Sequence, residues 1–326
     1  MASLPPPSQA AQAAPLICPG HSRPVVSIEF SECIADGIFL ISGCHDKTAQ
    51  LRNGETGDWI GTFEGHKGAV WGAALDAPVQ RAITCSADFS AKVWDATTGD
   101  ELHTFQHRHI VRTADWAPDS SRFITGGKEA KLRVFDMASP SADPQLISGH
   151  DKMIKVVKYL DTNTFLSAGE DTTLRVWDLR SGSATQQLQF GGPVNSVEIL
   201  ADGTTATIAA GNEVSFWDLP SWQCVKRHNL SVIEGNGYGV NSASIHPEKV
   251  RFVAGGGNFW VYEYDYETGE ELVCNKGHHG PVYGVRYMPD GRAYASAGDD
   301  GTIRFWGMAV DAEEDVGQSS VTESSK

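Results

Sequence analysis

Three sets of polar residues combine a histidine, a hydroxyl, a carboxylate and a tryptophan at matching spacing. They are His66, Thr84, Asp88 and Trp94; His150, Ser167, Asp171 and Trp177; and His278, Ser296, Asp300 and Trp306. A hydroxyl, an imidazole and a carboxylate are the parts of an activated nucleophile. A catalytic site has no reason to recur three times along one chain, however. We therefore predict a structural role for the sets and no catalytic residue.

Other patterns that carry chemistry are missing from the sequence. The six cysteines are scattered without a C-x-x-C pair, which argues against a zinc site or a disulfide framework. Reduced thiols favour a cytoplasmic or nuclear protein. The glycine-rich stretch Glu234-Gly-Asn-Gly-Tyr-Gly239 lacks the G-x-G-x-x-G and G-K-[ST] patterns of phosphate-binding loops, so we expect a surface loop there. The sequence predicts no metal and no cofactor.

The three sets belong to a repeat that runs along most of the chain. The histidine precedes the tryptophan by 28, 27 and 28 residues. With four weaker copies, the tryptophan-equivalent positions are 52, 94, 135, 177, 217, 264 and 306, at intervals of 42, 41, 42, 40, 47 and 42. Apolar and polar residues alternate in Leu174-Arg-Val-Trp177, as they do in a half-exposed strand. A period of about 40–45 residues is typical of a four-stranded repeat.

These residues resemble the WD-repeat β-propeller family over roughly residues 16–308. The resemblance implies an all-β fold, a seven-bladed WD-repeat β-propeller over residues 15–310. It also implies that Leu16-Ile17-Cys18 closes the ring as the outer strand of the blade that ends at Trp306. In this family, residues that match the three sets form buried hydrogen-bond chains from tryptophan through hydroxyl and histidine to aspartate. We predict that residues 1–14 and the acidic, serine-rich residues 311–326 are disordered tails.

Some blades depart from the family pattern. Blade one has Arg52 in place of the tryptophan, and blade three has Glu129 in place of the aspartate and Phe135 in place of the tryptophan. Blades five and six lack the Gly-His pair with which the stronger repeats begin. We expect blades five and six to depend on apolar packing.

The charge of the chain restricts its partners. Twenty-six basic and 41 acidic residues give a net charge of −15. This charge argues against a dedicated nucleic-acid binder and against docking on anionic lipid. No run of residues approaches the ~20 apolar residues that span a bilayer. We expect protein partners, contact with RNA only indirectly, and no membrane.

The family resemblance implies a binding surface on the narrow top face, around the central channel. Its fixed offsets from the Gly-His pair select one ring of residues, Val26, Trp71, Arg112, Lys155, Asn195, Asn241 and Tyr283. The positions just before the turn acids are His45, Ala87, Lys128, Glu170, Gly257 and Asp299. Tryptophan, tyrosine and arginine often anchor interfaces. Basic residues on an acidic protein favour an acidic peptide, or a phosphate, as the ligand. The alternative is that Trp71 packs on a neighbouring blade and the lysines are merely solvated.

A closer resemblance narrows the function. The segments Thr56–Phe63, Gly65–Gly72, Ala87–Phe89, Asn241–Ser244 and His246–Lys249 resemble the serine-threonine kinase receptor-associated protein family. The resemblance implies a non-enzymatic scaffold or adaptor in assembly of spliceosomal ribonucleoproteins with the survival-of-motor-neuron complex. It further implies roles in mRNA processing, translation regulation and receptor-kinase signalling.

Two other functions stay open at this point. The chain resembles, more distantly, the WD-repeat subunit of translation initiation factor three. In addition, Trp177-Asp178-Leu179-Arg180 fits the W-D-x-R box with which substrate receptors of cullin-RING ubiquitin ligases dock their adaptor.

Overall fold

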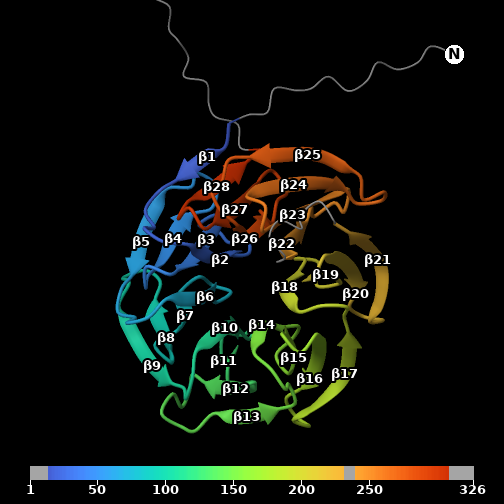
Figure 1. The fold of residues 1–326 in the computed structure, drawn as a ribbon. Helices are drawn as coiled ribbons and strands as arrows, with labels where there is room; N and C mark the ends of the chain where they lie inside the picture. Colours follow the sequence, from blue (N-terminus) through green and yellow to red (C-terminus); the bar gives the residue numbers. More distant parts are fainter. Residues whose placement is uncertain (1–13, 231–238, 308–326) are drawn as a thin grey trace, which may run out of the picture.

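The computed structural model describes residues 14–230 and 239–307. Seven four-stranded antiparallel sheets stand as blades around a central axis (Figure 1). The prediction of an all-β, seven-bladed propeller is confirmed. The described residues form no helix, and so none that could cross a membrane. The predicted tails and the loop after Leu230 lie outside the described residues, apart from Ala14 and Gly239.

Each blade takes its strands in chain order from the axis outward, and the last blade is completed by the first strand of the chain. Blades one to three contain β2 (Val25–Phe30), β3 (Phe39–Cys44), β4 (Ala49–Asn53) and β5 (Trp59–Phe63); β6 (Val70–Leu75), β7 (Arg81–Ser86), β8 (Ser90–Asp95) and β9 (Glu101–Gln106); and β10 (Val111–Trp116), β11 (Arg122–Gly127), β12 (Lys131–Asp136) and β13 (Gln145–Ser148).

Blades four to six contain β14 (Ile154–Tyr159), β15 (Thr164–Gly169), β16 (Thr173–Asp178) and β17 (Ser183–Gln189); β18 (Val194–Ile199), β19 (Thr205–Ala210), β20 (Glu213–Asp218) and β21 (Gln223–Asn229); and β22 (Val240–Ile245), β23 (Arg251–Gly256), β24 (Trp260–Asp265) and β25 (Glu271–Lys276). Blade seven contains β26 (Val282–Tyr287), β27 (Tyr294–Gly298), β28 (Ile303–Trp306) and β1 (Leu16–Cys18).

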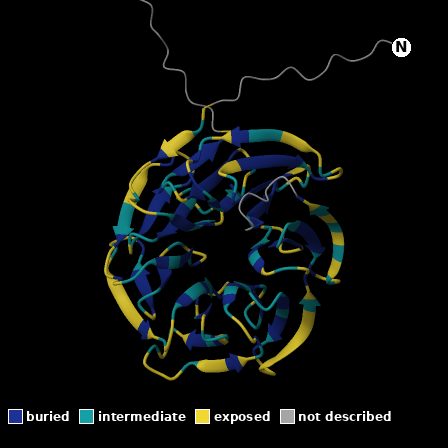
Figure 2. Ribbon diagram, viewed as in Figure 1, coloured by how far each residue is buried: buried dark blue, intermediate teal, exposed yellow. Residues whose placement is uncertain are grey.

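Burial changes from strand to strand within a blade. The second and third strands are buried almost throughout, because both of their faces pack on neighbouring blades, whereas the outer strands are mostly exposed (Figure 2). The apolar core lies between blades. One cluster joins Ile83 and Val93 of blade two to Val111 and Phe123 of blade three. The position of each blade is therefore fixed by its neighbours in the ring.

Strand β1 closes the ring as predicted. It pairs antiparallel with β28, with Leu16 opposite Phe305 and Cys18 opposite Ile303 (Figure 1). Cys18 is buried in the cluster that joins Phe305 to Val25 of blade one. Full closure leaves only short strand edges, which limits edge-to-edge association.

Blades five and six pack through aromatic residues, as expected. Phe216 lies against Phe252 at 5.1 Å and against Tyr266 at 4.9 Å, measured between ring centres. His228 stacks on Phe252 at 5.5 Å.

Candidate partner-binding site

The three polar sets lie as hydrogen-bonded chains inside their blades. In blade two the Trp94 indole N–H donates to Thr84 Oγ1 at 2.8 Å, and Thr84 Oγ1 lies 2.7 Å from His66 Nε2. His66 Nδ1 lies 2.9 Å from Asp88 Oδ2. Blades four and seven repeat the arrangement, with distances between 2.6 and 3.1 Å, in His150, Ser167, Asp171 and Trp177 and in His278, Ser296, Asp300 and Trp306.

The burial of these chains does not suit catalysis. The hydroxyl-bearing residues Thr84, Ser167 and Ser296 are each 0% exposed, so a substrate cannot reach a nucleophile there. Burial lowers the pKa of His66, although Asp88 acts in the opposite direction. Burial disfavours ionisation of Asp88, but hydrogen bonds from Ser90, the Lys67 backbone N–H and His66 outweigh it and lower the pKa to about 2. The blade-two chain therefore joins an imidazole whose protonation is disfavoured by burial to an ionised carboxylate.

Blade one builds the same chain without a tryptophan. His21 bonds to Ser42 and to Asp46, each at 2.9 Å. The buried guanidinium of Arg52 takes the place of the indole and donates to Gly57 O at 3.0 Å and to Gln50 Oε1 at 2.9 Å.

Blade three has a histidine that sequence reasoning missed. His107 Nε2 lies 2.9 Å from Thr125 Oγ1, and the imidazole packs against Phe135. Glu129 does not reach His107; it accepts hydrogen bonds from the Arg108 backbone N–H and from Arg133, both at 2.6 Å. His107 follows a glutamine instead of a glycine, which hid it from a search for Gly-His pairs.

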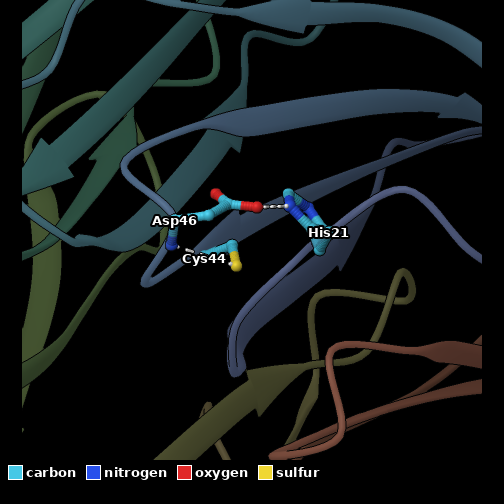
Figure 3. Close-up of side chains that lie close together, drawn as sticks. All are labelled: His21, Cys44 and Asp46. Atoms are coloured by element: carbon cyan, nitrogen blue, oxygen red, sulfur yellow. Dashed lines mark hydrogen bonds and ion pairs between the residues drawn. The ribbon is translucent and has the colours of Figure 1, made fainter.

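His21, Cys44 and Asp46 lie close enough together to resemble a metal site (Figure 3). Each side chain already has a protein partner, because Cys44 Sγ donates to Arg23 O at 3.0 Å and His21 bonds to Asp46. Burial raises the pKa of the Cys44 thiol to about 12, so it is a poor metal ligand. Ser86 of blade two makes the equivalent contact to Gly68 O, which shows that Cys44 fixes a turn.

The first strand of every blade carries a β-bulge at the same place. The residues that the register skips are Val26, Trp71, Arg112, Lys155, Asn195, Asn241 and Tyr283. A bulge re-aims a side chain. All seven line one cavity of about 320 Å³ in the central channel, together with His45. The structure thus brings together eight of the thirteen residues predicted for the top face, the seven bulged residues and His45.

Trp71 is half-buried in this cavity between two blades. The guanidinium carbon of Arg112 lies 4.5 Å from the centre of its ring, and the His45 ring meets it edge-on at 4.4 Å. The predicted open aromatic surface is therefore covered in part, and Trp71 does pack on neighbouring blades. Among the described atoms, the buried Trp71 Nε1 and His45 Nε2 have no hydrogen-bond partner.

Other cavity residues form hydrogen bonds between blades and within blade seven. Lys155 Nζ donates to Asn195 Oδ1 at 2.8 Å, and Asn241 Nδ2 donates to Val282 O at 2.9 Å. Tyr283 OH donates to Asp299 Oδ1 at 3.1 Å. Burial lowers the pKa of Lys155, with Arg112 adding to the effect and Glu170 opposing it. Burial likewise lowers the pKa of Arg112 to about 10, so its guanidinium group is charged at neutral pH.

Deeper in the channel, charged side chains pair across the ring. Lys158 of blade four reaches Glu29 of blade one and lies 3.1 Å from Asp115 Oδ1 of blade three. Arg286 lies 4.0 Å from Glu198 and donates to Ser242 Oγ at 2.8 Å. Sequence reasoning did not find this layer, although its residues stand three positions after the bulged ones.

Lys128, Glu170 and Asp299 do not line the cavity. Each lies just before a turn acid on the top face. This face carries the loops that lead into the first strands and the turns between the second and third strands. Lys128 is exposed there. Phe89, Lys67 and Arg108, which were not predicted as site residues, are exposed on the same face.

The alternative docking box lies at the opposite face. The Arg180 side chain is 73% exposed, but its guanidinium group pairs with the Asp178 carboxylate. Arg180 Nε donates to Asp178 Oδ1 at 3.0 Å, and Nη2 donates to Oδ2 at 2.7 Å. Trp177 of the same box is buried in the blade-four chain.

Comparison with known proteins agrees with this architecture. The family model "WD domain, G-beta repeat" matches residues 57–95, 99–136, 143–178 and 269–307. The serine-threonine kinase receptor-associated protein of Rattus norvegicus is 45% identical over 296 residues, covering 91% of this chain and 83% of the rat protein. That of Dictyostelium discoideum is 47% identical over 294 residues, covering 90% and 98%. Eukaryotic translation initiation factor 3 subunit I of Culex quinquefasciatus is 28% identical over 323 residues, covering 89% and 95%. The chain is therefore a seven-bladed WD-repeat propeller that belongs to the serine-threonine kinase receptor-associated protein family.

Proposed function

We propose that this protein is a non-enzymatic adaptor that binds acidic peptide segments of its partners at the mouth of the central channel. The observation that carries the proposal is the convergence of seven bulged residues on one cavity, with the cations Arg112 and Lys155 beside Trp71. A carboxylate in the cavity would accept from the unpartnered Trp71 Nε1–H, since an indole N–H is a donor only.

The family membership supports a proposal for the cellular role. The relatives are named for association with a serine-threonine kinase receptor. We propose that this chain likewise joins receptor-kinase signalling and ribonucleoprotein-assembly complexes of the survival-of-motor-neuron type, in the cytoplasm and the nucleus. Identities of 45% and 47% to these relatives, against 28% to the initiation-factor subunit, support an adaptor over that subunit.

A charge-reversal experiment tests this proposal. The full chain and its Lys155→Glu variant would be compared for capture of purified ribonucleoprotein-assembly partners at two salt concentrations. We expect the variant to lose capture, and wild-type capture to weaken as salt rises, because charge complementarity drives the association.

The control reverses an equal charge on the other face. Arg180→Glu lies in the ubiquitin-ligase docking box, at the turn between β16 and β17. We expect this variant to capture its partners as the wild type does. If Arg180→Glu loses capture and Lys155→Glu keeps it, the ubiquitin-ligase function is favoured and the channel mouth is excluded.

A further inference from the structure

Phe89 stands in the turn between β7 and β8 in a backbone conformation that disfavours it. Its φ is 70°, in the left-handed region that a bulky side chain rarely adopts. The equivalent turn of blade seven has a glycine, Gly301, with φ of 73°. Phe89 is nevertheless 42% exposed, so burial of the ring does not explain the presence of a phenylalanine. The same turn position is also left-handed at Lys47, Ala130 and Thr172, so the conformation belongs to the repeat, and the exposed aromatic side chain is what sets blade two apart from those blades.

Hydrogen bonds on both sides hold this turn in place. Asp88 Oδ1 accepts from the Ser90 backbone N–H at 3.0 Å, and Asp88 Oδ2 accepts from the Lys67 backbone N–H at 2.8 Å. The Phe89 carbonyl oxygen accepts from the His107 backbone N–H at 2.8 Å. The ring of Phe89 also lies 5.3 Å from that of His109. The aromatic side chain therefore has a fixed position on the top face.

Three exposed cations lie on the loops that contact this turn and on the corresponding turn of blade three. The Lys67 backbone N–H donates to Asp88, and Arg108 directly follows His107, whose backbone N–H donates to Phe89 O. Lys128 lies in blade three, where its backbone N–H donates to Ile110 O. Within residues 14–230 and 239–307, none of the three forms an ion pair. The neighbouring carboxylates are already engaged, Asp88 with His66 and Glu129 with Arg133.

We propose that Phe89, His109, Lys67, Arg108 and Lys128 form a second docking surface, here called the Phe89 surface, for an acidic peptide segment that carries an apolar side chain. The carboxylates pair with the three cations, and the apolar side chain packs on the Phe89 ring. The proposal rests on the proposed function, because it extends the same class of partner from the channel mouth over blades two and three. The channel mouth and the Phe89 surface both lie at the top of blade two. There the Ala87 backbone N–H donates to Ala69 O, which joins the turn that carries Phe89 to the loop before Trp71.

Blade six offers a matched control. Phe259 has φ of 72° and is 41% exposed, which nearly equals the values for Phe89. Its neighbour Lys276 already lies over the Trp260 ring, 4.4 Å from the ring centre. Phe259 therefore presents an aromatic ring without the three unpaired cations that adjoin Phe89.

The test uses two labelled nine-residue peptides, each with four aspartates on either side of a central leucine or a central serine. Binding to the full chain is measured by fluorescence anisotropy at 50 mM and 200 mM salt. We expect the wild type to prefer the leucine peptide roughly five- to tenfold. Phe89→Gly should remove this preference, and Phe259→Gly should retain it. Glycine suits the left-handed turn, so Phe89→Gly should unfold at an equal or higher denaturant concentration.

Other outcomes overturn the Phe89 surface. It fails if Phe89→Gly keeps the leucine preference, if Lys67→Glu with Arg108→Glu binds both peptides as the wild type does, or if the leucine peptide does not bind the wild type at 50 mM salt. If peptide binding is lost only in Lys155→Glu, the channel mouth still functions and the Phe89 surface alone is excluded.

Discussion

The guanidinium carbon of Arg112 lies 4.5 Å from the centre of the Trp71 ring, while Arg112 Nη1 donates to the Trp71 carbonyl oxygen at 3.1 Å. One side chain of blade three thus contacts both the ring and the backbone of a blade-two residue. The contact restrains the two bulges relative to each other and holds a cation in the cavity. Stability and partner binding are consequently linked at this position.

Arg112→Leu should weaken both properties. Loss of the cation–π contact and the hydrogen bond is expected to lower the free energy of unfolding by about 1 kcal/mol. Denaturant unfolding measures this change, and salt-dependent partner capture measures the binding loss. Arg112→Lys keeps the charge but not the planar group, so it should retain more capture than Arg112→Leu. Equal capture by the two variants would show that the charge of Arg112 is unimportant.

Asp171→Ala should destabilise the protein more than Glu129→Ala. Asp171 accepts from His150, from the Thr173 backbone N–H and from Thr173 Oγ1, whereas Glu129 accepts only from the Arg108 backbone N–H and from Arg133. Leaving His150 unpaired should cost about 1–3 kcal/mol. Because Glu129 also accepts hydrogen bonds, Glu129→Ala should lower the free energy of unfolding measurably, but by less than Asp171→Ala does. Equal shifts of the denaturant midpoint in the two variants would contradict the prediction that the blade-four hydrogen-bond chain stabilises the protein more than the Glu129 contacts do.

The ring itself could be predicted from the sequence, because the tryptophan-equivalent positions keep a nearly constant interval. The closing strand Leu16–Cys18 and the seven bulged positions followed from the resemblance to WD-repeat proteins. Their contacts did not: the sequence left open whether Trp71 presents a free aromatic surface or packs on a neighbouring blade, and in the structure Arg112 and His45 cover part of its ring. Packing between blades decides this, and a repeat pattern describes each blade by itself.

Other features lay beyond sequence reasoning for different physical reasons. The spacing identified Arg52 at the tryptophan position of blade one, but it did not reveal that the guanidinium group donates to Gly57 O and Gln50 Oε1. Lys158 and Glu29 are 129 residues apart and meet only because the ring closes. The turn at Phe89 is held by hydrogen bonds to Asp88 from Ser90 in the same turn and from Lys67 in the loop before β6.

Stability should fall as the solution is made acidic. Burial lowers the pKa of His66 and His150, so below about pH 6.5 the unfolded chain binds more protons than the native one and stability declines. Asp88, whose pKa is lowered to about 2, contributes stability that is lost between about pH 4 and pH 2. Denaturant midpoints at pH 7, 5 and 3 measure the decline. Asp88→Asn should lose less between pH 4 and pH 3 than the wild type does, and a midpoint that stays constant from pH 7 to pH 3 would contradict the hydrogen-bond assignments.

Removal of β1 should open the ring. A chain that begins at Gly20 lacks the pairing of Leu16 with Phe305 and the buried Cys18. We expect a melting temperature several degrees below that of a chain that begins at Ala14, which keeps β1 and serves as the control. Equal melting temperatures would show that blade seven is stable with three strands.

Lys158→Met should leave two carboxylates of the channel, Glu29 and Asp115, without their shared cation. Breaking a partly buried ion pair in this way costs about 3–5 kcal/mol at neutral pH. Adding Asp115→Asn should restore part of the loss, because the amide oxygen can still accept from the Tyr159 backbone N–H, as Asp115 Oδ2 does at 2.7 Å. Burial raises the pKa of Asp115, and Lys158 opposes this effect in the wild type. Without Lys158 the native carboxyl group should hold its proton to higher pH than the unfolded one, so the variant loses stability as pH rises through that pKa. The difference in unfolding free energy between Lys158→Met and the wild type should therefore be smaller at pH 5 than at pH 7, and equal differences at the two pH values would contradict an electrostatic role for Lys158.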